Sequence, residues 1–276
     1  MRIGVFTVFN DTGIGPVDTA VALEMRGFDY LFTADHSHIP VGSKSQYPMG
    51  GPTPPPLYRT LDSFVSLTAA AAVTKSLVVG TGVALVVQRD PFYTAKEVAS
   101  LDWVSQGRFR FGVGLGWLRE EIANHGVDPR VRGRVLDEKL GAIIAMWTEE
   151  KPEFHGEFVN FDPIDCYPKP FTKPYPPIYL GAQSAAGFAR IGQLGAGWYP
   201  AAFSADTLSQ DLKKVRDLVG ADVPVIAQHV GEPTAKELEA YRDLGIEDLT
   251  VWLPTQPRDE SLQFLDELHA EVAKLG

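Results

Sequence analysis

The segment Leu77–Gly116, LVVGTGVALVVQRDPFYTAKEVASLDWVSQGRFRFGVGLG, contains the structural unit that recurs along the whole chain. Its first part, Leu77–Val87, is a valine-rich apolar run that predicts a buried strand. Asp90-Pro91 is a helix-start signal, and the helix it predicts covers Pro91–Val104. A second strand is predicted at Arg108–Gly116. Near-continuous apolar strands that alternate with helices are typical of parallel sheets covered by helices.

The same alternation extends in both directions from this segment. The other predicted strands are Ile3–Val8, Tyr30–Asp35, Ile178–Ala182, Gly197–Ala201, Val223–Val230 and Leu249–Leu253. The other predicted helices are Pro16–Gly27, Asp62–Val73, Glu120–His125, Arg132–Trp147, Ser184–Leu194, and three that begin near Asp206, Thr234 and Asp259. The Pro-rich region Pro152–Pro177 interrupts the rhythm, and Phe154–Phe161 within it predicts a small hairpin.

Eight strand–helix units in 276 residues predict a single-domain (β/α)₈ barrel, a TIM barrel of the α/β class, over residues 1–276. A doubly wound sheet is the alternative, because the same alternation serves both folds. The count of eight favours the barrel. No shift in composition marks a domain boundary.

Composition narrows the class of function. The formal net charge of −10 argues against nucleic-acid binding, which needs a basic face. No apolar run of about 18 residues predicts a membrane span, and the N-terminus enters a strand without a signal-peptide pattern. Cys166 is the only cysteine, so no intrachain disulfide can form. We therefore expect a cytoplasmic enzyme that acts on a small molecule.

In such a barrel the active site lies at the carboxyl ends of the strands. The most polar strand end is Asp35-His36-Ser37-His38. His36 is a candidate proton donor or cofactor neighbour, since imidazole titrates near neutral pH. The His36–His38 pair beside Asp35 is also a conceivable metal site. Such a site would need more ligands, and only His229 is an obvious candidate, so we predict no metal.

Two further strand ends are rich in small residues. The spacing of Gly112-Val113-Gly114-Leu115-Gly116 differs from a dinucleotide-binding fingerprint. These glycines allow either a sharp bend or the close approach of a flat ligand. Gly181–Ala186 ends a strand and opens a helix, whose free N–H groups suit a phosphate. The alternative is that Ser184 is an ordinary helix N-cap.

Several separate stretches, taken in order, carry a resemblance to one known family. They are Glu97–Asp102, Gly107–Phe109, Gly112–Glu121, Arg132–Arg134 with Asp137-Glu138, Phe154–Gly156, Pro168–Pro170 and Gly195–Trp198. Together they cover most of the chain. The chain resembles the luciferase-like monooxygenase superfamily, and more closely its actinobacterial branch, which is predicted to use coenzyme F420.

The resemblance implies that the strand ends hold an isoalloxazine or deazaisoalloxazine ring, with His36 as the catalytic residue beside its reactive face. A bulge with a non-prolyl cis peptide would fall at Gly82-Val83 and back the ring. The residues implied in cofactor binding are Asp35, Thr81, Gly82, Val83, Gly114, Leu115, Gly116, Trp117, Gly181, Gln183, Ser184 and Ala185.

The resemblance leaves several functions open. The leading hypothesis is an F420-dependent oxidoreductase that transfers hydride between the deazaflavin and a small organic substrate. The alternatives are an FMN-dependent monooxygenase, a flavin-binding accessory protein without turnover, and a metal-dependent barrel hydrolase. Because many relatives dimerise, a homodimer is also open.

The chain departs from the family pattern in two places. Only Gly231–Pro233 separates the seventh strand from its helix, so we expect an open or partner-covered substrate pocket. Trp117 stands where sugar-phosphate dehydrogenases of the superfamily have a catalytic glutamate, and that activity is not expected. Glu120 and Glu121 are expected to face solvent on a helix. The long loop Ile39–Tyr58 is either a wall of the pocket or a packed surface loop.

Overall fold

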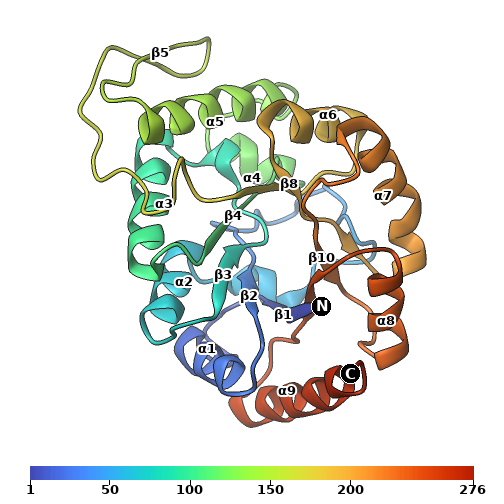
Figure 1. The fold of residues 1–276 in the computed structure, drawn as a ribbon. Coiled ribbons are helices and arrows are strands. Elements are labelled where there is room, and N and C mark those ends of the chain that lie inside the picture. Colours follow the sequence, from blue (N-terminus) through green and yellow to red (C-terminus); the bar gives the residue numbers. More distant parts are fainter.

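The computed structural model describes residues 1–276 as a closed (β/α)₈ barrel, as predicted (Figure 1). The sheet order is β8-β7-β4-β3-β2-β1-β11-β10-β9, and neighbouring strands are parallel. β8 (Gly197–Trp198) and β9 (Ala201–Ala202) are two halves of one interrupted strand. β8 pairs with β7 and β9 pairs with β10, while Trp198 bridges to Val225. The two edges of the sheet therefore meet, which excludes a doubly wound sheet.

The elements follow one another as strand and helix around the ring. The other strands of the barrel are β1 (Arg2–Thr7), β2 (Tyr30–Thr33), β3 (Val78–Thr81), β4 (Phe109–Val113), β7 (Ile178–Leu180), β10 (Ile226–His229) and β11 (Asp248–Trp252). The helices are α1 (Pro16–Met25), α2 (Ser63–Ala72), α3 (Pro91–Ser105), α4 (Arg119–Asn124), α5 (Arg132–Thr148), α6 (Ala185–Leu194), α7 (Ala205–Val219), α8 (Ala235–Asp243) and α9 (Arg258–Ala273). Short 3₁₀ helices lie at Pro55–Arg59 and Val86–Gln88.

Local sequence signals explain where several helices begin. The side chains of Asp62, Asp90, Ser184 and Thr234 each accept a hydrogen bond from a backbone N–H in the first turn of the following helix. Such caps satisfy N–H groups that have no partner inside the helix. The hairpin predicted in the Pro-rich region is also present, as β5 (Phe154–His155) and β6 (Asn160–Phe161). It projects outside the ring of helices (Figure 1).

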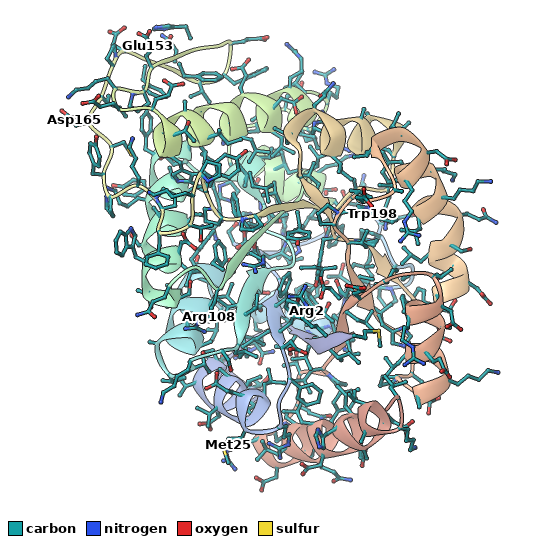
Figure 2. All side chains as sticks on the ribbon, viewed as in Figure 1. Arg2, Met25, Arg108, Glu153, Asp165 and Trp198 are labelled. Atoms are coloured by element: carbon teal, nitrogen blue, oxygen red, sulfur yellow. The ribbon has the colours of Figure 1, made fainter.

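Two apolar layers hold the barrel together. One cluster has nine buried residues, and its strand residues, such as Phe6 and Phe32, alternate with those of the main core. Phe32 and Tyr199 stack there with ring centroids 5.1 Å apart. The main core of 51 buried residues joins the strands to the helices. Side chains fill the strand ring and its helical coat, whereas Glu153 and Asp165 lie on the projecting segment (Figure 2).

The predicted third strand, Leu77–Val87, is too long. β3 ends at Thr81, the Gly82-Val83 peptide bond is cis, and a 3₁₀ helix begins at Val86. Val86 and Val87 are fully buried beside α5, so the apolar run continues because of helix packing. Apolar composition alone does not separate these two causes.

Prolines shorten two other predicted strands. The strand predicted at Gly197–Ala201 breaks at Pro200, and β10 begins after Pro224 instead of at Val223. Proline has no N–H to donate to a neighbouring strand. The carbonyl groups of both prolines still accept hydrogen bonds, Pro200 from Gln228 and Pro224 from Trp198. The barrel therefore stays closed at these positions.

Candidate active site

The carboxyl ends of the strands enclose a cavity of about 410 Å³. Nine of the twelve residues expected to bind cofactor line it: Gly82, Val83, Gly114, Leu115, Gly116, Trp117, Gly181, Gln183 and Ser184. Thr81 lies behind the wall, fully buried, and donates its hydroxyl to the Gly112 carbonyl at 2.6 Å. Ala185 is the first residue of α6. The structure therefore gathers most of these residues at one place.

The glycines at the end of β4 are required by packing. A Cβ on Gly112 would overlap the carbonyl oxygen of Thr81, and a Cβ on Gly114 would overlap the side chain of Val83. Gly116 has a φ of +77°, in the left-handed region that glycine adopts without strain. The structure shows the sharp bend, and Gly114 and Gly116 also line the cavity, where the close approach of a flat ligand stays a prediction.

His36 forms a buried pair with Glu121. Its Nδ1 lies 2.8 Å from Glu121 Oε2, and the two side chains are 6% and 1% exposed. Glu121 also accepts hydrogen bonds from the backbone N–H of Ser37 at 2.8 Å and from its hydroxyl at 3.1 Å. Burial raises the pKa of this carboxyl, but its bond to His36, the attraction of His36 and the bonds from neighbouring polar groups lower it to about 2. Glu121 is therefore held as a carboxylate.

The expectation that Glu120 and Glu121 face solvent is wrong for Glu121. Glu121 and Ile122 lie three and four residues after Leu118, the residue that precedes α4, and all three side chains are buried on the inner side of this helix. This spacing is the sequence signal that could have identified it. Glu120 lies on the outer side and accepts hydrogen bonds from Lys44 N and Ser45 Oγ.

Asp35 is an anchor for the site. Its carboxylate accepts two hydrogen bonds from Arg89, at 2.7 and 2.9 Å, and one from the Leu85 N–H at 2.9 Å. The hydroxyl of Ser63 completes the set at 3.2 Å. Since the side chain is 6% exposed, this ion pair is largely withdrawn from water. Asp35 thus ties the end of β2 to the loop after β3.

The residues considered for a metal do not assemble as the sequence suggested. His229 lies apart, with Nδ1 3.1 Å from the Tyr241 hydroxyl. The atoms that do come together belong to His38, Glu121 and His125, within 4.8 Å of one another. The hydroxyl of Ser37 lies among them, 2.8 Å from His38 Nδ1 and 2.7 Å from His125 Nε2. A hydrogen-bonded network therefore joins these three groups.

One cation of the large cavity was not predicted as a site residue. Arg132 lines the cavity, and its Nε is buried without a hydrogen-bond partner. Ser184 lines the same cavity and caps α6, accepting from Gly187 N at 3.2 Å. A free guanidinium N–H and a helix N-terminus are both donors for an anion. Arg132 lies far from Ser184 in the chain, and only the family-like Arg132-Gly133-Arg134 stretch pointed to it.

A smaller cavity of about 190 Å³ adjoins the large one and shares Val83, Trp117 and Gln228 with it. Twelve of its eighteen lining residues are hydrophobic. His36 lies on its wall, with its ring edge-on to that of Trp117 at 5.8 Å.

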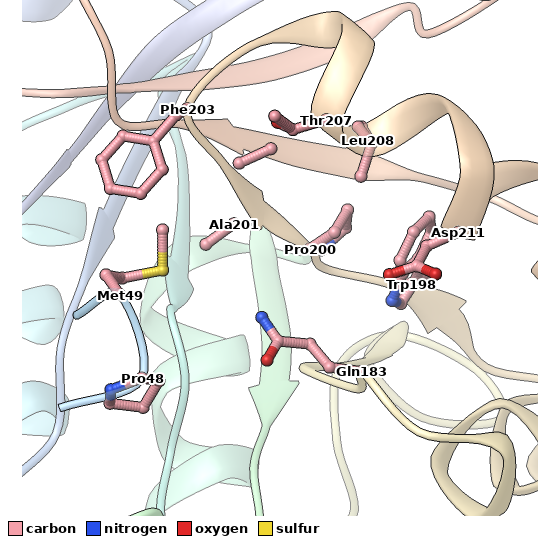
Figure 3. A pocket seen from close by; sticks show the side chains of 11 residues that line it. Pro48, Met49, Gln183, Trp198, Pro200, Ala201, Phe203, Thr207, Leu208 and Asp211 are labelled. Carbon is pink, nitrogen blue, oxygen red and sulfur yellow. The ribbon is translucent and has the colours of Figure 1, made fainter. Parts of the chain in front are cut away.

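The loop Ile39–Tyr58 contributes Tyr47, Pro48 and Met49 to this wall, so it is part of the pocket. A third cavity, of about 220 Å³, is lined by Met49 and Phe203 among others, and Gln183 points into it (Figure 3). The long loop therefore lies between two of the cavities.

Sequence comparisons relate the chain to one uncharacterized protein and to two enzymes whose names give F420 or FMNH₂ as cofactor. The sequence is 34% identical to an uncharacterized protein of Mycobacterium tuberculosis, over 99% of both chains. It is 30% identical to an F420-dependent glucose-6-phosphate dehydrogenase of Nakamurella multipartita, over 72% of this chain and 56% of that one. It is 32% identical to an FMNH₂-dependent dimethylsulfone monooxygenase of Pseudomonas putida, over 35% of this chain and 27% of that one.

Solved structures show the same fold at low identity. A monooxygenase from Streptomyces bottropensis superposes with a TM-score of 0.77 at 19% identity, over 99% of both chains. A coenzyme F420-dependent tetrahydromethanopterin reductase from Methanopyrus kandleri superposes with a TM-score of 0.74 at 14% identity, over the whole of both chains.

The chain belongs to the luciferase-like monooxygenase family, which it matches over residues 1–273. Members of this family are flavin- or F420-dependent oxidoreductases, so the protein is an enzyme of that class. No helix of the structure is long and apolar enough to cross a membrane.

Proposed function

We propose that the protein is an F420-dependent oxidoreductase that transfers hydride between the deazaflavin and a small organic substrate. The observation that carries the proposal is the placement of the His36–Glu121 pair. His36 lies on the wall of an apolar cavity that shares Gly82, Val83 and Trp117 with the large cavity, and Glu121 lies behind it. A proton donor, a substrate space and a ring-sized space thus adjoin one another.

The large cavity suits a cofactor that is flat at one end and anionic at the other. Gly82, Val83 and the glycines after β4 would back the ring, because they leave backbone exposed on the cavity wall. Arg132 and Ser184 would hold the phosphate, and the unpartnered Nε of Arg132 supports this assignment. When bound, the deazaflavin supplies hydride chemistry.

His36 would move a proton at the substrate. Its Nδ1 is committed to the Glu121 carboxylate, so this nitrogen carries the proton in the neutral imidazole. Nε2 makes no hydrogen bond within the protein and remains free to give or take a proton. Glu121 acts through His36 as a positioning residue, because its carboxylate fixes both the ring orientation and the tautomer.

The connection after β10 favours F420 over FMN. Only Val230–Thr234 joins β10 to α8, so this connection contributes no long covering loop. A reduced flavin that activates oxygen needs a site closed to water, because reactive intermediates otherwise hydrolyse. Hydride transfer from a deazaflavin to an organic substrate depends less on a site closed to water.

The test is anaerobic reoxidation of reduced F420 in the presence of the protein and a panel of carbonyl compounds. We expect recovery of the oxidised deazaflavin absorbance with at least one compound. His36→Asn should lower the rate by about 100-fold or more while F420 affinity stays within a few-fold. Oxygen consumption with reduced FMN, together with no reaction of reduced F420, would instead identify a monooxygenase.

A further inference from the structure

The small cavity contains no free charge. Its lining includes no lysine and no arginine, and its charged carboxylate, Asp35, is already paired with Arg89. Glu121 lies behind His36 and is paired in turn. An ionic ligand would therefore lose its hydration without gaining a counter-charge, which is strongly unfavourable. The lining therefore favours a neutral ligand over an ionic one.

Most of the wall is apolar and aromatic. Phe6, Tyr47, Trp117 and Trp252 supply ring surfaces, and Phe6 packs on Trp252 with centroids 5.3 Å apart. Pro48 and Met49 also line this cavity and face the neighbouring one (Figure 3). A dry apolar cavity of about 150 Å³ holds benzene. The 190 Å³ here therefore suits a compound of about six to ten non-hydrogen atoms.

One amide side chain on this wall takes no part in holding the fold together. Gln228, at the end of β10, is 7% exposed and lines both the small and the large cavity. Its backbone N–H bonds to the Pro200 carbonyl, whereas its side-chain amide takes part in no hydrogen bond within the protein and is open to the cavities that it lines. In a mostly apolar binding cavity, a few such polar groups orient the ligand by hydrogen bonding to it.

We propose that the small cavity binds a neutral, mostly apolar compound of about six to ten non-hydrogen atoms, whose single carbonyl or hydroxyl oxygen hydrogen-bonds the Gln228 amide. This inference rests on the proposed function, because it takes the larger cavity as the cofactor site. The proposed ligand class excludes sugar phosphates and other anions as substrates. Gln228 is the specificity-determining residue.

Binding can be tested without turnover. Calorimetric titrations of the F420-loaded protein would use cyclohexanone, benzene, cyclohexanecarboxylate and cyclohexylammonium. Cyclohexanone should bind at least tenfold more tightly than either ion, because a charge would be buried without a partner. Gln228→Leu should weaken cyclohexanone binding about three- to tenfold and leave benzene binding within twofold. Gln193→Leu, an exposed position on α6, is the matched control and should change neither.

The outcomes separate the two proposals. If F420 binds and either ion binds as tightly as cyclohexanone, the inference is overturned while the proposed function stands. The same follows if Gln228→Leu leaves cyclohexanone affinity unchanged, or if it weakens F420 binding instead. Failure of F420 to bind the wild-type protein would overturn the proposed function itself. Gln228→Met repeats the test with a side chain of similar volume if the leucine variant does not fold.

Discussion

Replacing Glu121 by glutamine removes one charge from the centre of the site and preserves its shape. The carboxylate is 1% exposed and accepts hydrogen bonds from His36 Nδ1 and Ser37 N, both at 2.8 Å. In Glu121→Gln one amide position can still accept from Ser37, but the other presents an NH₂ group to His36. The imidazole must then change tautomer or lose its partner.

The size of the effect follows from the pKa of the carboxyl. Lowering this pKa from 4.5 to about 2 on folding corresponds to about 3 kcal/mol in favour of the folded state. Because the folded-state pKa is the lower one, this contribution is fully present above pH 4.5 and is lost as the pH falls towards 2. Glu121→Gln should therefore reduce the free energy of unfolding by about 2–3 kcal/mol at pH 7.

Urea unfolding at several pH values measures this free energy. The difference between wild type and Glu121→Gln should shrink to less than about half of its neutral value by pH 3. Glu120→Gln is the matched control. Glu120 bonds the outer loop at Lys44 and Ser45, and its loss should cost less than about 1 kcal/mol. A Glu121→Gln effect no larger than the control, or one independent of pH, would refute this description of the pair.

Three further substitutions test other parts of the structure. Arg132→Met should weaken the binding of both F420 and FMN about tenfold or more. The control is Arg134→Met, which removes a guanidinium that pairs with a surface glutamate and should change binding less than twofold. Fluorescence titration of each variant checks this, and equal effects would remove Arg132 from the phosphate site. Gly112→Ala should prevent recovery of folded protein or lower the free energy of unfolding in urea by more than about 4 kcal/mol, because the new Cβ would meet a backbone oxygen of the neighbouring strand. An unfolding midpoint equal to that of the wild type would contradict this close packing. Asp35→Asn should cost about 2–4 kcal/mol, because it removes the most buried of the three carboxylates that pair with Arg89 and leaves only the more exposed Asp62 and Glu97. A loss below about 1 kcal/mol in the same assay would show that the pair is not needed.

The sequence predicts the barrel because its signals are local and repeated. Valine-rich strands and the caps at Asp90 and Thr234 recur in the predicted order. The lengths of individual strands were less predictable. Val86 and Val87 are buried by α5, which is distant in the sequence, so no local pattern separates them from a strand.

The sequence predicted the parts of the candidate site that lie at strand ends. It did not predict the contacts that side chains from separate units make with one another. The glycines and His36 follow strands directly, so the barrel rule located them. The spacing on α4 could indicate that Glu121 faces inward, but its pairing with His36 is seen only in the structure, and so is the position of Gln228 on the walls of two cavities. Both properties depend on the tertiary packing of separate units, which a single sequence does not display.

The most direct test of the central claim is an equilibrium titration of cofactor-free protein with F420 and, separately, with FMN, followed by fluorescence. The proposed function predicts that F420 binds at least about tenfold more tightly than FMN, a difference of about 1.4 kcal/mol. Tighter binding of FMN would contradict the proposed function and favour the monooxygenase, and binding of neither would contradict the assignment of the large cavity to a flavin-type cofactor.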